Sequence, residues 1–236
     1  MRAAIYYAPA LTDPLWAAGT CWLGRDPERG VALVQPDVAG IAAATAAPRR
    51  YGFHATIKPP MRLAFGLDAL MADVRELLAG VAPFEMPGLR VSRIDGFIAL
   101  TEIERSAALQ AVADLCVTGL ERHRVAESAT EMARRAGRLD EHGRGLLARY
   151  GYGHVLDRWQ FHMTLSERMA DGDALEAAAR GYFAAALGMA RRVEGVAVFV
   201  EDKPGAAFRL VGRVGFGEGK KKVTAHPQSD WLSSST

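Results

Sequence analysis

The chain has 236 residues, a formal net charge of +2 and a hydrophobic fraction of 50%. It is therefore long enough to bury a core as one large domain or two small lobes. Acidic and basic residues are well mixed, which disfavours a strongly charged partner such as long RNA. Cys21 and Cys116 lie far apart with no CxxC spacing, which argues against a disulfide framework and against a zinc–cysteine site.

No segment of the sequence predicts a membrane partner. The N-terminal stretch MRAAIYYAPA lacks the long apolar core of a signal peptide, and the chain has no apolar run of about 18 residues. We therefore expect a cytoplasmic protein, and the composition leaves its oligomeric state open.

In the first half of the chain, strand and helix signals alternate. Pro14 suits the first turn of a helix that Thr12 or Asp13 caps. Asp95-Gly96 stands between two apolar runs, which is a strong hairpin signal. The predicted elements are a strand at residues 2–8, helices at 12–23 and 37–47, a strand within 51–60 that ends at Pro59-Pro60, a helix at 67–80 and a hairpin at 90–100.

The second half begins with helical spacing and ends with another hairpin. Lys203-Pro204-Gly205 supplies the turn of that hairpin. The predicted elements are helices at 106–123, 126–136 and 139–150, a strand around 161–165, a helix at 171–190 and hairpin strands at 193–200 and 207–216. The polar, aperiodic end of the chain predicts a disordered tail over residues 217–236.

One short string occurs twice. Phe-His-x-Thr followed by an aliphatic residue stands at 53–57 and at 161–165, and a helix and then a hairpin follow each copy. This order predicts an α+β fold made by duplication of a small antiparallel unit. We expect a single domain over residues 1–216, with a first unit at 51–101, a helical insertion at 104–150 and a second unit at 154–216.

Each copy of the string presents a polar pair on one face. Side chains alternate across a strand, so His54 shares a face with Thr56, and His162 shares a face with Thr164. If the two units pack about a pseudo-twofold axis, both polar faces line one cleft. Such a set suits acid–base chemistry on a phosphoester, with one imidazole accepting a proton and the other donating one. Threonine hydroxyls then donate hydrogen bonds to phosphate oxygens.

Further residues near the strings are candidate substrate ligands. Lys58 shares the face of His54 if the strand continues, and Arg168 follows the second string closely; either cation would neutralise a phosphate. Tyr51 is placed to stack on a ribose or a base, and ordinary packing at a lobe interface explains this aromatic residue equally well.

The paired strings resemble those of the 2H phosphoesterase superfamily. The longer strings RYGFHATIKPP, CWLGRD and YGYGHVLDRWQFHMTLSER are similar to an uncharacterised branch that is encoded among bacterial phosphonate-utilisation genes. The resemblance implies a bilobal fold with two antiparallel sheets, flanked by helices, around a central cleft. It also implies that His54 and His162 are the catalytic acid/base pair and that Thr56 and Thr164 bind phosphate.

From these features we expect a cyclic phosphodiesterase that needs neither metal nor cofactor. Its expected substrate is a small cyclic phosphate, of the 2′,3′-cyclic nucleotide or ribose 1,2-cyclic phosphate type, in phosphonate metabolism. The alternative is a non-catalytic binding module for a phosphorylated nucleotide or sugar. A third interpretation, a metal-dependent hydrolase, is weakened because no carboxylate accompanies either histidine string.

Overall fold

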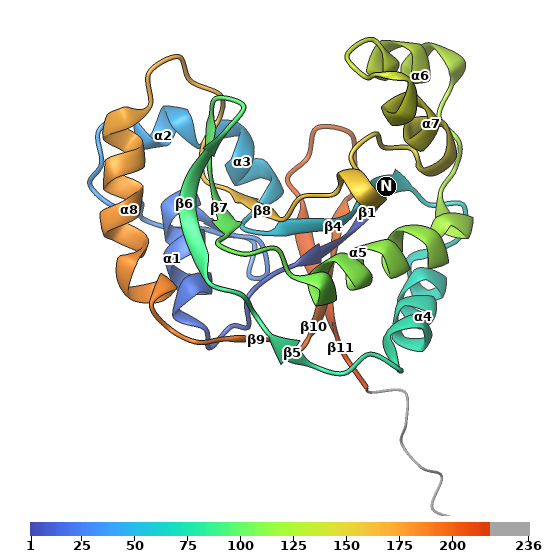
Figure 1. Ribbon diagram of the computed structural model, residues 1–236, viewed down its shortest axis with the longest axis horizontal. Helices are drawn as coiled ribbons and strands as arrows, with labels where there is room; N and C mark the ends of the chain where they lie inside the picture. Colours follow the sequence, from blue (N-terminus) through green and yellow to red (C-terminus); the bar gives the residue numbers. More distant parts are fainter. Residues whose placement is uncertain (218–236) are drawn as a thin grey trace, which may run out of the picture.

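The computed structural model describes residues 1–217, so the tail predicted at 217–236 lies, apart from its first residue, outside the described residues. The fold is mixed α/β with antiparallel sheets (Figure 1). The strands are β1 (Arg2–Tyr7), β2 (Arg25–Asp26), β3 (Val31–Ala32), β4 (Ala55–Arg62), β5 (Phe84–Glu85), β6 (Leu89–Ile94), β7 (Phe97–Glu102), β8 (His162–Thr164), β9 (Arg192–Val193), β10 (Gly195–Glu201) and β11 (Arg209–Gly215).

The helices surround the strands on both sides of the picture (Figure 1). They are α1 (Pro14–Leu23), α2 (Ile41–Ala44), α3 (Ala46–Tyr51), α4 (Leu67–Leu78), α5 (Ala107–Gly119), α6 (Ala129–Ala136), α7 (Glu141–Tyr150) and α8 (Asp173–Leu187). Two short 3₁₀ turns, η1 (Glu121–His123) and η2 (Leu156–Arg158), follow α5 and α7. No helix among residues 1–217 has the length and apolar character needed to cross a membrane.

The main sheet has seven strands in the order β11-β10-β1-β4-β8-β7-β6, and every neighbouring pair is antiparallel. The resemblance implied two sheets in two lobes. The hydrogen bonding instead runs through one sheet, because β4 and β8 pair directly at Ala55 and Met163. The α+β class is confirmed, and the bilobal arrangement is not.

Both halves of the chain repeat the same order of elements, as the sequence predicted. β4 is followed by α4, the short strand β5 and the hairpin β6–β7, and β8 is followed by α8, the short strand β9 and the hairpin β10–β11. The halves are interleaved, since β8 pairs with β7 of the first half and β5 pairs with β9. Helix α4 packs on β11, and α8 packs on β6. Each helix therefore covers the hairpin of the other half.

Local signals explain several boundaries. Asp13 caps α1, since its side chain accepts a hydrogen bond of 2.8 Å from the Leu15 backbone N–H. The β6–β7 turn places Asp95 at φ 47° and Gly96 at φ 85°, as expected for a two-residue hairpin turn of the primed type. The predicted helix at 37–47 differs from the structure, which has two short helices, α2 and α3, meeting at Thr45.

The first string does not end at its prolines, contrary to the prediction. β4 continues through Pro59 and Pro60 to Arg62. Its pairing with β1 shifts register on both sides of the Ile5–Lys58 pair, which marks β-bulges. Proline is tolerated at a bulge because no ladder hydrogen bond is lost there.

Helices α6 and α7 form an arm that stands apart from the sheet (upper right of Figure 1). A small apolar cluster lies at the base of the arm, separate from the main core, and consists of Val117, Leu146, Tyr150 and Val155. The arm covers only the second part of the helical insertion predicted at 104–150, because α5, in the first part, packs on β4. Its exit loop leads directly into β8.

Candidate functional site

The two histidine strings lie side by side at the centre of the main sheet. Because Ala55 pairs with Met163 in an antiparallel ladder, His54 stands across from Thr164, and Thr56 stands across from His162. Directly opposed residues have Cβ atoms about 5 Å apart, and diagonal neighbours such as the two histidines are about 7 Å apart. Two strings that are far apart in the sequence therefore form one polar patch on one face of the sheet.

The opposite face of both strings is buried. The side chains behind the polar patch are at most 1% exposed, and they are Phe53, Ala55, Ile57, Phe161, Met163 and Leu165. Phe53 packs so closely on Gly19 of α1 that a Cβ atom there would lie 2.2 Å from its ring. This apolar backing fixes both strands, and with them the polar patch.

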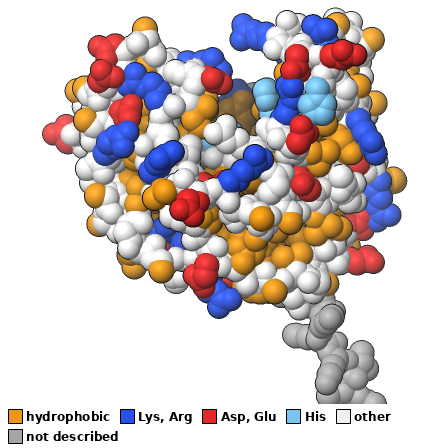
Figure 2. Space-filling model, in the orientation of Figure 1, with side chains coloured by type: hydrophobic (Ala, Val, Ile, Leu, Met, Phe, Trp, Pro, Cys, Tyr) orange, Lys and Arg blue, Asp and Glu red, His pale blue; other side chains and the backbone are white. Residues whose placement is uncertain are grey.

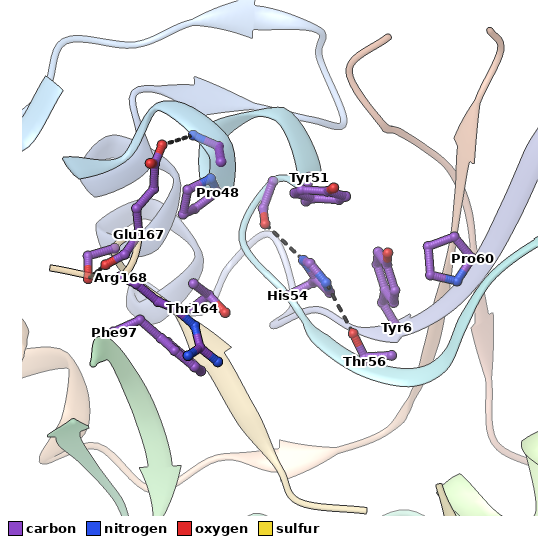
Figure 3. A pocket seen from close by; sticks show the side chains of 13 residues that line it. Tyr6, Pro48, Tyr51, His54, Thr56, Pro60, Phe97, Thr164, Glu167 and Arg168 are labelled. Atoms are coloured by element: carbon purple, nitrogen blue, oxygen red, sulfur yellow. Dashed lines mark hydrogen bonds between the residues drawn. The ribbon is translucent and has the colours of Figure 1, made fainter. Parts of the chain in front are cut away.

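Both imidazoles are held in the same way. Nδ1 of His54 lies 2.9 Å from the Gly52 carbonyl oxygen, and Nδ1 of His162 lies 2.9 Å from the Gln160 carbonyl oxygen. A carbonyl only accepts, so each Nδ1 carries the proton and each neutral imidazole keeps its lone pair on Nε2. Nε2 of His54 lies 3.4 Å from the Thr56 hydroxyl (Figure 3).

Burial keeps both histidines neutral near pH 7. Desolvation lowers the pKa of His54 to about 4, with a further lowering by nearby His162. Desolvation also lowers the pKa of His162, with a smaller contribution from His154. The hydrogen bonds to the Gly52 and Gln160 carbonyls oppose these shifts. The unliganded site is therefore a pair of proton acceptors.

Two adjoining cavities open at the polar patch. The larger, about 540 Å³, contains His54, Thr56 and Thr164; the smaller, about 230 Å³, contains His162 and His154. Thr56, Phe97 and Arg168 line both cavities. Figure 2 shows the molecule hollowed between the arm and the body, with histidine side chains at the rim. A ligand that contacts both imidazoles must therefore also lie against these three shared residues.

Tyr51 lines the larger cavity, and its contact with substrate stays a prediction. The guanidinium of Arg50 lies 4.9 Å from the centre of the Tyr51 ring and donates a hydrogen bond of 2.7 Å to its hydroxyl. Tyr6, which the sequence did not single out, also lines this cavity and stacks on His54 (Figure 3). The only signal for Tyr6 was its place in the first strand, since nothing in the sequence showed that this strand pairs with β4.

Lys58 is not at the site, so the prediction that it binds substrate is wrong. Lys58 is 1% exposed, and its Nζ donates to the Val117 carbonyl of α5 and to Glu121, both at 2.9 Å. The bulge in β4 interrupts the alternation on which the prediction relied, so Ile57 and Lys58 are both buried. Lys58 therefore ties β4 to α5 through the Val117 carbonyl and to η1 through a part-buried ion pair with Glu121, and desolvation lowers its pKa.

Arg168 lies beside the polar patch, and its binding of substrate stays a prediction. It lines both cavities, its side chain is 70% exposed, and its nearest carboxylate, Asp95, is 3.8 Å away. Its neighbour Glu167 is engaged elsewhere, because its carboxylate accepts a hydrogen bond of 2.7 Å from the Ala47 backbone N–H. Arg168 is thus a loosely held cation beside the polar patch.

The remaining groups at the site hold the strands in place. The indole N–H of Trp159 donates to the Thr56 carbonyl at 2.8 Å, and the indole N–H of Trp22 donates to the Leu165 carbonyl at 2.8 Å. Each string is therefore anchored by a tryptophan from elsewhere in the chain.

Among residues 1–217, no three His, Cys, Asp or Glu side chains gather in a way that would hold a metal ion.

Comparison with known proteins gives a family and two relatives. The family described as "Protein of unknown function (DUF1045)" matches residues 56–209, well over half of the chain. The "Ribose 1,5-bisphosphate phosphokinase PhnN" of Janthinobacterium sp. (strain Marseille) is 32% identical over 95% of this chain and 53% of its own length. The protein of the same name from Laribacter hongkongensis (strain HLHK9) is 35% identical over 89% of this chain and 50% of its own length.

These relatives overturn the predicted activity. Both are named as a phosphokinase, which adds a phosphoryl group, and neither as a hydrolase that opens a cyclic phosphate. The prediction of a cyclic phosphodiesterase is therefore wrong. Both names describe enzymes, and the chain spans about half the length of these curated relatives. The matched family is not described as a 2H phosphoesterase, so that resemblance stays a prediction.

Proposed function

The chain belongs to the DUF1045 family, and from that premise we propose that it binds a small phosphorylated ribose, on which His54 and His162 act as a proton-transferring pair. The names of both relatives support the ligand class, since they specify a ribose bisphosphate. The symbol PhnN in those names fits the role in phosphonate metabolism that the sequence resemblance implied.

The observation that carries the proposal is the matched hold on the two imidazoles. With each Nδ1 bonded to a backbone carbonyl and both rings neutral near pH 7, each Nε2 offers a lone pair. A neutral Nε2 accepts a hydrogen bond from a ribose hydroxyl and is the base to which that proton passes. The other ring, when it is protonated from solvent, donates a hydrogen bond to a phosphate oxygen.

Neighbouring groups suit the phosphate and the sugar. The hydroxyls of Thr56 and Thr164 donate hydrogen bonds to phosphate oxygens, and Arg168 supplies the positive charge that a phosphate requires. The ring of Tyr51 packs against the sugar. A cavity of about 540 Å³ lies within the range of small-molecule sites.

The proposal assigns the sugar phosphate, and not a nucleotide donor, to this chain. The sequence contains no GxxxxGK[ST] motif, whose glycine-rich loop cradles the phosphates of ATP in P-loop kinases. GRVGFGEGKK at residues 212–221 has neither the spacing nor the hydroxyl residue of that motif.

Phosphorus NMR and calorimetric titration test this proposal together. The ligands are ribose 5-phosphate and ribose 1,5-bisphosphate, with free ribose and inorganic phosphate as references. We expect both sugar phosphates to bind saturably and more tightly than either reference. The double variant His54→Ala/His162→Ala should lose at least about tenfold in affinity, as the removal of two hydrogen-bonding groups requires. The control His142→Ala removes an exposed histidine that lines neither cavity and should leave affinity unchanged.

Two outcomes contradict the proposal in different ways. Absence of saturable binding for either sugar phosphate rejects the ligand class. Binding that survives the double variant rejects the role of the two histidines and favours a non-catalytic binding module, the alternative that the sequence raised.

A further inference from the structure

The two imidazoles share their Nδ1 contacts but differ in what covers their rings. The ring of Tyr6 stacks on His54, with centroids 3.7 Å apart and planes 21° apart. The ring of Phe97 lies beside His162, with centroids 5.8 Å apart and planes tilted by 58°. His54 therefore has one face closed by a phenol ring, whereas His162 has no stacked partner among residues 1–217.

Tyr6 is fixed in this position from behind. It pairs with Thr56 in the β1–β4 ladder, so its side chain projects on the face that carries the polar patch. Phe199 of β10 and Phe208 pack on Tyr6 with centroid distances of 5.0 Å and 6.4 Å. Tyr6 is 1% exposed, so the ring on which His54 rests is part of the core.

A stacked ring disfavours the charged form of His54 by removing water from one face. The attraction between a cation and an aromatic face acts in the opposite direction and offsets part of this penalty. The balance is still towards the neutral form, since desolvation is the largest cause that lowers the pKa of His54 to about 4.

The other polar groups around His54 do not restore the charge. Tyr51 at the end of α3 and His162 of β8 carry no negative charge near pH 7, and Arg168 is a cation. Glu167 lines the same cavity, but its carboxylate is bonded to the Ala47 backbone N–H. Within residues 1–217, no carboxylate is therefore hydrogen-bonded to the His54 ring.

We propose that Tyr6 is a positioning residue that holds His54 as the proton-accepting member of the pair, and that His162 is the member that carries the proton when an anion binds. This assignment rests on the proposed function, because it divides roles within the same pair. In the step described above, the hydroxyl proton moves to Nε2 of His54, while the Nε2–H of protonated His162 donates to a phosphate oxygen. Arg158, which is paired with Asp140, and Arg168 line the smaller cavity around His162 and attract an anion to it. Without an anion these cations and His154 oppose protonation of His162, and the negative charge of a bound phosphate then favours the protonated ring.

The test is a pH titration of the histidine ring nitrogens by long-range proton–nitrogen NMR on the ligand-free protein between pH 3.5 and 8. His54→Gln and His162→Gln assign the signals. We expect His54 to stay neutral down to about pH 5 and to titrate near pH 4, and His162 to titrate at higher pH than His54. In Tyr6→Leu the titration midpoint of His54 should rise by about one pH unit, a fraction of the largest burial shifts known. Tyr6→Phe keeps the stacked ring and should restore the wild-type behaviour of His54.

A second arm adds ribose 5-phosphate at pH 7, where the expected change is protonation of His162 with His54 still neutral. The control Phe97→Leu should shift the midpoint of His162 and leave that of His54 in place. A wild-type His54 that titrates at or above His162 overturns the assignment, even if Tyr6→Leu does not fold. A folded Tyr6→Leu with an unchanged His54 midpoint overturns the role of Tyr6. Because the titration needs no ligand, these failures are distinct from failure of the sugar phosphate to bind.

Discussion

The two histidine strings are nearly the same in sequence, and the protein gives them different surroundings. Both present a histidine and a threonine on one face, both bury three apolar residues behind, and both fix Nδ1 on a backbone carbonyl. His54 is then covered by Tyr6 of β1, whereas His162 faces the exit loop of the arm, with His154 and Arg158. The repeated string supplies two nearly equal strands, and the elements packed around them make the surroundings of the two histidines unequal.

The largest effect should come from the apolar backs, where the strings are equivalent. Phe53→Ala and Phe161→Ala remove side chains that are 0% and 1% exposed, and each should lower the free energy of unfolding by about 3–5 kcal/mol. Urea denaturation at constant m-value measures this. Phe65→Ala, at a position 54% exposed, is the control and should stay within about 0.5 kcal/mol. If Phe53→Ala lowers the free energy of unfolding and Phe161→Ala does not, the two apolar backs are not equivalent.

The next effect concerns the position four residues after each histidine, where Lys58 and Ser166 differ. Lys58→Met removes one partner of the part-buried pair with Glu121 and should cost about 3 kcal/mol. Glu121 keeps its bond of 2.6 Å to Arg124, which limits the loss. Affinity for ribose 5-phosphate, measured on folded protein by calorimetry, should not change, because Lys58 lines neither cavity. A drop in affinity at unchanged stability would return Lys58 to the site.

The pH dependence of the free energy of unfolding should differ between variants of the two histidines. Below about pH 6.5 the unfolded chain protonates His54, while the folded protein resists until the pH approaches about 4. Unfolded protein then binds more protons, so the free energy of unfolding falls as the pH falls through this window. Wild type should lose roughly 2 kcal/mol more than His54→Gln between pH 6.5 and 4.5. Guanidinium titrations at several pH values test this, and an equal or larger effect of His162→Gln would contradict the proposed division.

The smallest effect should come from the two tryptophan anchors. Trp159→Phe and Trp22→Phe each remove an indole N–H that donates to a strand carbonyl at 2.8 Å. The loss should be about 1–2 kcal/mol in each case, since a buried carbonyl loses its donor. Thermal unfolding measures both. If only Trp159→Phe weakens ribose 5-phosphate binding, the hydrogen bond from Trp159 to the Thr56 carbonyl also positions the Thr56 hydroxyl between the two cavities.

The sequence by itself determined the parts of this protein. Asp13 with Pro14, and Asp95 with Gly96, identified a helix start and a hairpin turn because caps and tight turns depend on a few neighbouring residues. The alternation of each string predicted its polar and apolar faces for the same reason. The repeated order of strand, helix and hairpin was also readable, since it needs only local periodicity.

Only the tertiary structure decided how these parts meet. The pairing of β4 with β8 in one sheet, and the placement of β1 beside β4, join segments that are distant in the chain. Such pairings depend on which apolar faces are buried together, which no local pattern records. The same pairing brought Tyr6 onto His54 and, through the bulge in β4, turned Lys58 away from the patch. A bulge is set by the register between two strands, so the sequence of one strand could not reveal it.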